Sequence, residues 1–116
     1  MPMRHGEPTT VGGAPGVALR GEVDLAIAEE VQAELEEAIL ASEGAFVIDL
    51  SAVEFLDSSG IRALLRARGV LGRADRSLIL VCPPGPVRRM LSLVGIDDLF
   101  VLFEGRTEAA RRLRAR

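Results

Sequence analysis

Residues 46–60 read FVIDLSAVEFLDSSG. They divide into an apolar run at 46–50, a short segment at 51–56 that crosses to the next element, and a polar corner at 57–60. Phe46–Leu50 is apolar except for Asp49, as is typical of a strand that is covered on both faces. Asp57 precedes a helical pattern of apolar residues, so it is expected to cap the N-terminus of a helix. The stretch therefore predicts a buried strand that ends at a corner, where Ser58 and Ser59 present two adjacent hydroxyls.

The same order of strand and helix occurs four times along the chain. The expected strands are 17–21, 46–50, 78–82 and 99–103, and the expected helices begin near Asp24, Asp57, Pro86 and Thr107. Strands that alternate with helices predict a mainly parallel sheet with right-handed crossovers. We therefore expect an α/β fold, with a four- to five-stranded sheet and four helices in βα repeats.

The length of 116 residues is that of one domain, which we expect to span residues 17–116. Residues 1–16 are rich in glycine, proline and threonine and show no apolar alternation. They are expected to form a flexible or irregular N-terminal segment, or a poor edge strand. His5, the only histidine of the chain, lies in this segment.

The composition favours a soluble cytoplasmic protein. Cys82 is the only cysteine, which excludes an internal disulfide and fits a reducing compartment. Because Cys82 lies in an apolar run, it is expected to be a buried packing residue. No apolar run is long enough to enter a membrane directly. The chain has four phenylalanines and no tryptophan or tyrosine, which argues against a base-stacking nucleic-acid surface.

The net charge of −3 is the sum of an acidic N-terminal half and a basic C-terminal half. Residues 1–57 contain two arginines and twelve acidic residues, whereas residues 58–116 contain twelve arginines and five acidic residues. Solvated helix faces of opposite sign explain this pattern most simply. The alternative is a bipolar surface that steers a charged protein partner.

The sequence argues against an enzyme. A serine nucleophile requires a base, and the only histidine lies in the N-terminal segment. The corner does not match G-x-S-x-G, and no P-loop is present. A phosphate-accepting receiver domain relies on a lysine beside an acidic cluster, and the chain has no lysine. No cofactor and no metal ion are therefore expected.

The corner is expected to lie at a rim where several polar loops gather. Loops that leave the carboxyl ends of parallel strands share one rim, which here collects Glu22, Asp24, residues 57–60, residues 83–86 and residues 104–107. A phosphate on exposed Ser58 would meet free amide hydrogens, yet it would add about −1.5 to −2 charges beside two aspartates and repel a bound partner. Gly60 is expected to leave room for that partner. On these four residues alone, simple helix capping is the favoured interpretation.

Three segments together resemble the STAS domain family. Gly21-Glu22-Val23-Asp24 before an amphipathic helix is similar to the G-E-[LV]-D entry of these domains. Val47–Leu50 and Val53–Ile61 resemble their central signature, and the apolar strand ending at Cys82 also fits. The resemblance covers roughly residues 17–114.

Free-standing STAS domains of this size resemble bacterial anti-sigma factor antagonists. The resemblance implies that the chain binds an anti-sigma factor that is also a serine kinase, and so frees a sigma factor. It implies that phosphorylation of Ser58 stops this binding and that a phosphoserine phosphatase restores it. Glu22, Asp24, Asp57, Ser59 and Gly60 would belong to the partner surface, and ATP would be bound by the kinase. An alternative within the family is an accessory subunit of a membrane transporter or of a stress-sensing complex.

Overall fold

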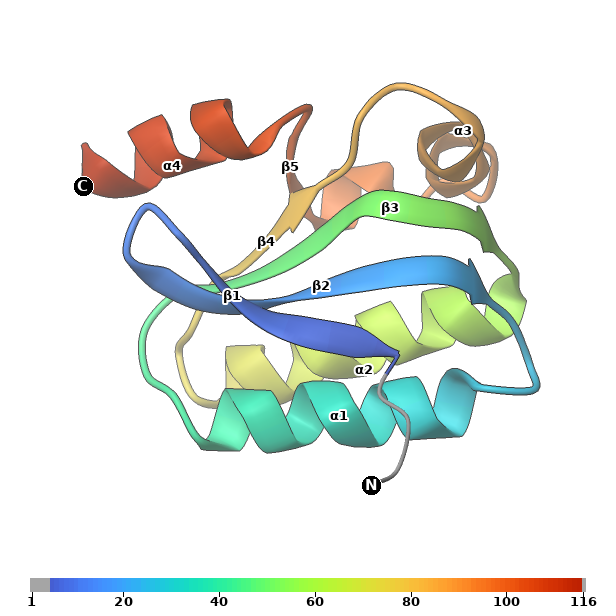
Figure 1. Ribbon diagram of the computed structural model, residues 1–116, viewed down its shortest axis with the longest axis horizontal. Helices are drawn as coiled ribbons and strands as arrows, with labels where there is room; N and C mark the ends of the chain where they lie inside the picture. The colour runs from blue at the N-terminus through green and yellow to red at the C-terminus, as the bar shows by residue number, and fades with distance from the viewer. Residues whose placement is uncertain (1–4, 116) are drawn as a thin grey trace.

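The computed structural model describes residues 5–115, which form one mixed sheet with helices on both of its faces (Figure 1). In chain order the elements are β1 (Gly6–Val11), β2 (Ala14–Val23), α1 (Ala28–Leu40), β3 (Phe46–Leu56), α2 (Ser58–Arg73), β4 (Leu78–Val81), α3 (Pro86–Leu93), the 3-10 helix η1 (Asp97–Leu99), β5 (Val101–Phe103) and α4 (Arg106–Arg114). The α/β fold, the mainly parallel sheet and the four helices predicted from the sequence are thereby confirmed.

The strands lie in the order β1-β2-β3-β4-β5. β1 pairs with β2 in the antiparallel direction, and every other pair is parallel. Helices therefore carry the chain from each parallel strand to the next, as parallel pairing requires. β3 lies at the centre, and its apolar run Phe46–Leu50 is buried, which agrees with coverage on both faces.

Two apolar cores lie on opposite faces of the sheet. α1 and α2 cover one face, and α4 covers the other (Figure 1). The larger core is aliphatic apart from Phe46, Phe100 and Cys82, and α3 contributes to it through Val87 and Leu91. The smaller core consists of Val11, Val47, Ile79, Val81, Phe103 and Ala109. Cys82 is 1% exposed, and burial raises the pKa of its thiol while the nearby Arg88 opposes this effect, so the expectation of a packing residue is confirmed.

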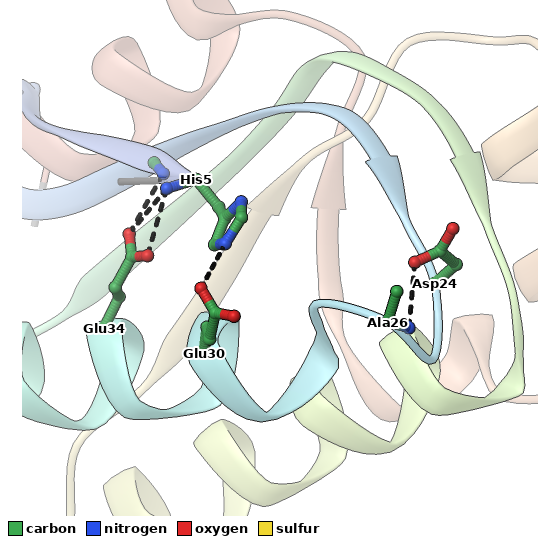
Figure 2. A network of polar contacts seen from close by, with 6 residues as sticks. His5, Asp24, Ala26, Glu30 and Glu34 are labelled. Atoms are coloured by element: carbon green, nitrogen blue, oxygen red, sulfur yellow. Dashed lines mark hydrogen bonds and ion pairs between the residues drawn. The ribbon is translucent and has the colours of Figure 1, made fainter. Parts of the chain in front are cut away.

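The N-terminal segment is more regular than the sequence predicts. β1 is an edge strand paired residue by residue with β2, and β2 begins at Ala14, so the boundary expected between residues 16 and 17 falls inside a strand. The Glu34 carboxylate on α1 accepts hydrogen bonds from the backbone amides of His5 and Gly6 at 3.0–3.1 Å (Figure 2). These hydrogen bonds between the Glu34 side chain and the backbone hold the edge strand over α1. A search for apolar alternation does not detect a strand that is held in this way. Residues 1–4 of the segment lie outside the described residues.

β3 is also longer than predicted, and its length divides the expected rim. β4 pairs with β3 only from Phe46 to Asp49, whereas β2 follows β3 as far as Leu56. Seven further residues of strand extend β3 by about 23 Å. The corner at Asp57 therefore lies well beyond residues 104–107, because Arg106 is bonded to Asp49, and the expectation that this loop shares the rim is wrong.

A buried ion pair joins β3 to the start of α4. The Asp49 side chain is 6% exposed, and its Oδ2 accepts a hydrogen bond from Arg106 Nη1 at 2.8 Å. Ser51 donates to Asp49 Oδ1 through its amide and its hydroxyl. Burial alone raises the pKa of Asp49, but the bonds from Ser51 and Arg106 outweigh it and hold the pKa below the usual 3.8. Arg106 also donates to Thr9 Oγ1 at 2.6 Å, which ties β1 to the same group.

We expect Arg106→Ala to lower the free energy of unfolding at pH 7 by about 1.5–3 kcal/mol, because a buried carboxylate loses a charged donor. A carboxyl whose folded pKa is depressed stabilises the fold above its unfolded pKa, and this contribution disappears as the pH falls through the folded pKa. The difference between the variant and the wild type should therefore shrink below about pH 4. Urea unfolding at several pH values measures it, with Arg111→Ala on the same helix as the control. A difference independent of pH would contradict this role of Asp49.

Candidate functional site

Asp57 organises the corner between β3 and α2. It is the N-cap of α2, with an extended backbone, and its Oδ1 accepts hydrogen bonds from the amides of Ser59 at 2.9 Å and Gly60 at 3.1 Å. The predicted capping role is therefore confirmed. The same bonds correct a second expectation, because the amides of Ser59 and Gly60 are already occupied and are not free for a phosphate.

The turn between β2 and α1 is bonded to this corner. Leu25 donates its amide to Asp57 Oδ2 at 3.1 Å, and the amide of Asp57 donates to the carbonyl of Val23 at 3.3 Å. β2 and β3 end side by side, since Glu22 lies opposite Phe55 and Val23 opposite Leu56. The structure thus brings Glu22 and Asp24 to the same rim as residues 57–59, as the parallel topology predicts.

Asp24 does not cap α1, although the sequence predicts that it does. The helix begins four residues later at Ala28, and the Oδ1 of Asp24 accepts the amide of Ala26 at 3.0 Å inside the preceding turn (Figure 2). The carbonyl of Asp24 accepts the amides of Ile27 and Ala28. Asp24 therefore shapes the turn that faces the corner and leaves the helix N-terminus without a side-chain cap.

The two serines have different surroundings. Ser58 is the first residue of α2 and is exposed, and within residues 5–115 its hydroxyl has no hydrogen-bond partner. Ser59 is half-buried and lines a hollow of about 270 Å³ between the starts of α1 and α2, together with Leu25, Arg62 and Arg66. Ser58 is therefore the more accessible of the two hydroxyls.

Gly60 has a packing role, whereas the sequence interpretation expected it to leave room for a partner. It is buried, and a Cβ at this position would lie 2.5 Å from Leu56 Cδ1 and 2.7 Å from the carbonyl oxygen of Val23. The glycine lets the first turn of α2 pack directly against the ends of β2 and β3. Its contribution to the site is to fix the position of the serines.

Two exposed apolar side chains flank the corner and were missed in the sequence. Leu25 is 76% exposed and Phe55 is 45% exposed. Large exposed apolar side chains beside a polar group are typical of protein contact surfaces. Phe55 was missed because residues 51–56 were interpreted as a crossing segment, whereas they continue the strand β3, in which both Glu54 and Phe55 are exposed.

We expect Asp57→Ala to lower the free energy of unfolding by about 1–2 kcal/mol, because both helix amides and the amide of Leu25 lose their acceptor. Hydrogen exchange of the Ser59 and Gly60 amides should become faster in the same variant. Chemical denaturation and exchange measured by NMR test both effects. Ser58→Ala is the matched control, since its hydroxyl caps nothing, and its unfolding free energy should stay within about 0.5 kcal/mol of the wild type. Equal stability of the two variants would show that the cap is unimportant.

Within residues 5–115 no group of three or more His, Cys, Asp or Glu side chains is arranged to hold a metal ion. None of the helices in the same range is long and apolar enough to cross a membrane. The corner therefore offers a hydroxyl, carboxylates and apolar side chains as its chemistry.

The STAS domain family model matches residues 7–109, and the chain belongs to this family. The match includes β1, which the sequence resemblance left out, and it ends inside α4.

The known proteins similar to this chain include anti-sigma factor antagonists. The chain is 34% identical over 108 residues to the anti-sigma-F factor antagonist RsfB of Mycobacterium tuberculosis, covering 90% of this chain and 88% of that protein. The crystal structure of an anti-sigma factor antagonist from Mycobacterium paratuberculosis is 30% identical, with a TM-score of 0.83, and the match covers 94% of this chain and 92% of that one. Unphosphorylated SpoIIAA, also an anti-sigma factor antagonist, shares the fold at 23% identity and a TM-score of 0.72, over 96% of this chain and 99% of that one.

Proposed function

We propose that this protein is an anti-sigma factor antagonist whose binding is switched by phosphorylation of Ser58. In the unphosphorylated form it binds an anti-sigma factor serine kinase in the cytoplasm and so frees the sigma factor. The kinase transfers a phosphate from ATP to Ser58, which ends the binding, and a phosphoserine phosphatase restores it. The protein itself holds no cofactor in this cycle.

The observation that carries the proposal is the placement of Ser58. Its hydroxyl is exposed at the first position of α2. The preceding residue, Asp57, fixes the backbone there, because its carboxylate accepts the amide of Ser59 in α2 and the amide of Leu25 in the turn before α1. A kinase requires a serine that it can reach without unfolding the substrate. A fixed corner also lets a partner distinguish a hydroxyl from a phosphate, because Ser58 cannot move away from the contact.

The surroundings of Ser58 suit a partner surface. Exposed Leu25 and Phe55 offer apolar contact, while Glu22 and Asp24 give the rim a negative charge. RsfB supports the assignment by its name as an antagonist of an anti-sigma factor. SpoIIAA has been solved in both an unphosphorylated and a phosphorylated form, so a protein of this fold accommodates the modification.

The test mixes the full chain with candidate anti-sigma kinases and ATP and follows transfer of phosphate. Ser58→Ala should abolish transfer while leaving binding to the kinase nearly unchanged. Ser59→Ala is the matched control and should still accept phosphate, because its amide rather than its hydroxyl takes part in the cap. Labelling of Ser58→Ala as strong as that of the wild type would refute the assignment.

A further inference from the structure

The edge of the sheet at β5 carries unpaired main-chain groups. β5 is the last strand in the sheet order, so only β4 lies beside it. The amide of Cys82 donates to the carbonyl of Phe103 at 2.8 Å, which places the polar groups of Phe103 on the side of β4. Because these groups alternate along a strand, the N–H and C=O of Leu102 point away from β4. Such groups are a template for another strand.

Two hollows lie on either side of this edge. The first, of about 460 Å³, lies between β5 and the C-terminal half of α2, and the second, of about 260 Å³, lies between β5 and α4. Both reach Ser77 and Val101. Successive side chains of a strand point to opposite faces, so an added strand would place one side chain in each hollow in turn.

The hollows are lined by apolar residues and by arginines. Arg68 and Arg73 line the first hollow, and Arg112 lines the second, where its guanidinium lies 5.8 Å from the centre of the Phe103 ring. Among the described residues no acidic side chain lines either hollow. Arg73 has no hydrogen-bond or ion-pair partner within residues 5–115, and Arg68 uses only its Nε, which donates to the carbonyl of Leu99 at 2.6 Å. Carboxylates therefore complement both hollows.

Two glycines of α2 widen the first hollow without serving the packing of the chain itself. A Cβ at Gly72 would meet nothing within 4 Å, and a Cβ at Gly69 would meet only the guanidinium of Arg73 at 3.6 Å. Each glycine destabilises a helix by about 0.5–1 kcal/mol relative to alanine. Their small size lets a second backbone lie close to α2 at the open edge.

We propose that the β5 edge binds an extended acidic segment of another protein, which adds as a sixth strand and places carboxylates beside Arg68, Arg73 and Arg112. A second copy of this chain does not fit the edge, because symmetric pairing would bring the same arginines together. Gly69 follows Ser58 by eleven residues of helix, or about 16 Å, so this surface is separate from the corner. The inference does not depend on the function proposed for Ser58.

A library of random peptides of about twelve residues, selected on the full chain, tests the proposal. Acidic sequences should be enriched, and the best synthetic peptide should slow hydrogen exchange of the Leu102 amide. Its affinity, measured by fluorescence anisotropy, should fall roughly tenfold in the double variant Arg73→Glu, Arg112→Glu and should weaken with added salt. Arg89→Glu, an exposed arginine of α3 outside both hollows, is the matched control and should bind as the wild type does.

Three results would overturn the proposal. Selected peptides without an acidic preference would remove the charge argument, and unchanged exchange at Leu102 would show that no strand is added. Equal loss of affinity in Arg89→Glu and in the double variant would show that only net charge matters. Slower Leu102 exchange with rising protein concentration, in the absence of peptide, would identify a second copy as the occupant instead.

Discussion

Gly60→Val is expected to lower the free energy of unfolding by about 3 kcal/mol or more, which is a large part of the roughly 5–15 kcal/mol that holds a domain of this size. A Cβ at Gly60 already lies 2.7 Å from the carbonyl oxygen of Val23 and 2.5 Å from Leu56 Cδ1. Leu56 can turn aside, but the backbone of β2 cannot move without disturbing its pairing with β3. Urea unfolding followed by circular dichroism measures the loss.

Gly72→Ala is the matched control for this prediction, because it lies on the same helix in open space. There the higher helix propensity of alanine should raise the free energy of unfolding by about 0.5 kcal/mol. The two substitutions should therefore act in opposite directions. If Gly60→Val unfolds at the same urea concentration as the wild type, the first turn of α2 does not pack against β2 as described.

Phosphorylation of Ser58 is expected to weaken binding to the anti-sigma factor by roughly a hundredfold, which corresponds to about 2.8 kcal/mol. The modification adds about −1.5 to −2 charges at a rim that already holds Asp24 and Asp57. The amides of Ser59 and Gly60 already donate to Asp57 and are not free to donate to the phosphate, so little within the corner offsets its charge. Calorimetric titration of the phosphorylated and unphosphorylated forms measures the difference.

Ser58→Glu should reproduce part of this loss, roughly tenfold, because a carboxylate carries less charge than a phosphate. Ser92→Glu places the same charge on an exposed position of α3 and should leave the affinity within about twofold of the wild type. Equal losses in both variants would mean that net charge, rather than the position of Ser58, governs binding.

The sequence was sufficient for the architecture and for the cap. The buried part of β3, Phe46–Leu50, is an almost continuous apolar run, which predicts a strand that is covered on both faces. Asp57 directly precedes the apolar pattern of α2, which is the position of a helix N-cap. Pro86 begins α3 and Gly95 follows its end with a φ of 74°, as the preferences of both residues predict. These features depend on neighbours in sequence, so a local pattern reveals them.

The sequence was insufficient where contacts between distant residues decide the outcome. β1 is held by Glu34, which lies 28 residues beyond Gly6, and no alternation marks that strand. The true extent of β3 depends on pairing with β2, and this length separates the corner from residues 104–107. Gly60 resembles an exposed turn residue in sequence, and only the positions of Val23 and Leu56 show that it is a packing residue.

The state of Ser58 in the protein isolated from its own cells tests the central claim most directly. Intact-mass measurement followed by fragmentation should find a fraction of the chain heavier by about 80 Da, the mass of one phosphate, and should localise the increment to Ser58. That fraction should be absent from complexes isolated with the anti-sigma factor. A phosphate localised to another residue while Ser58 stays unmodified, or phosphorylated Ser58 recovered within the complex, would contradict the account.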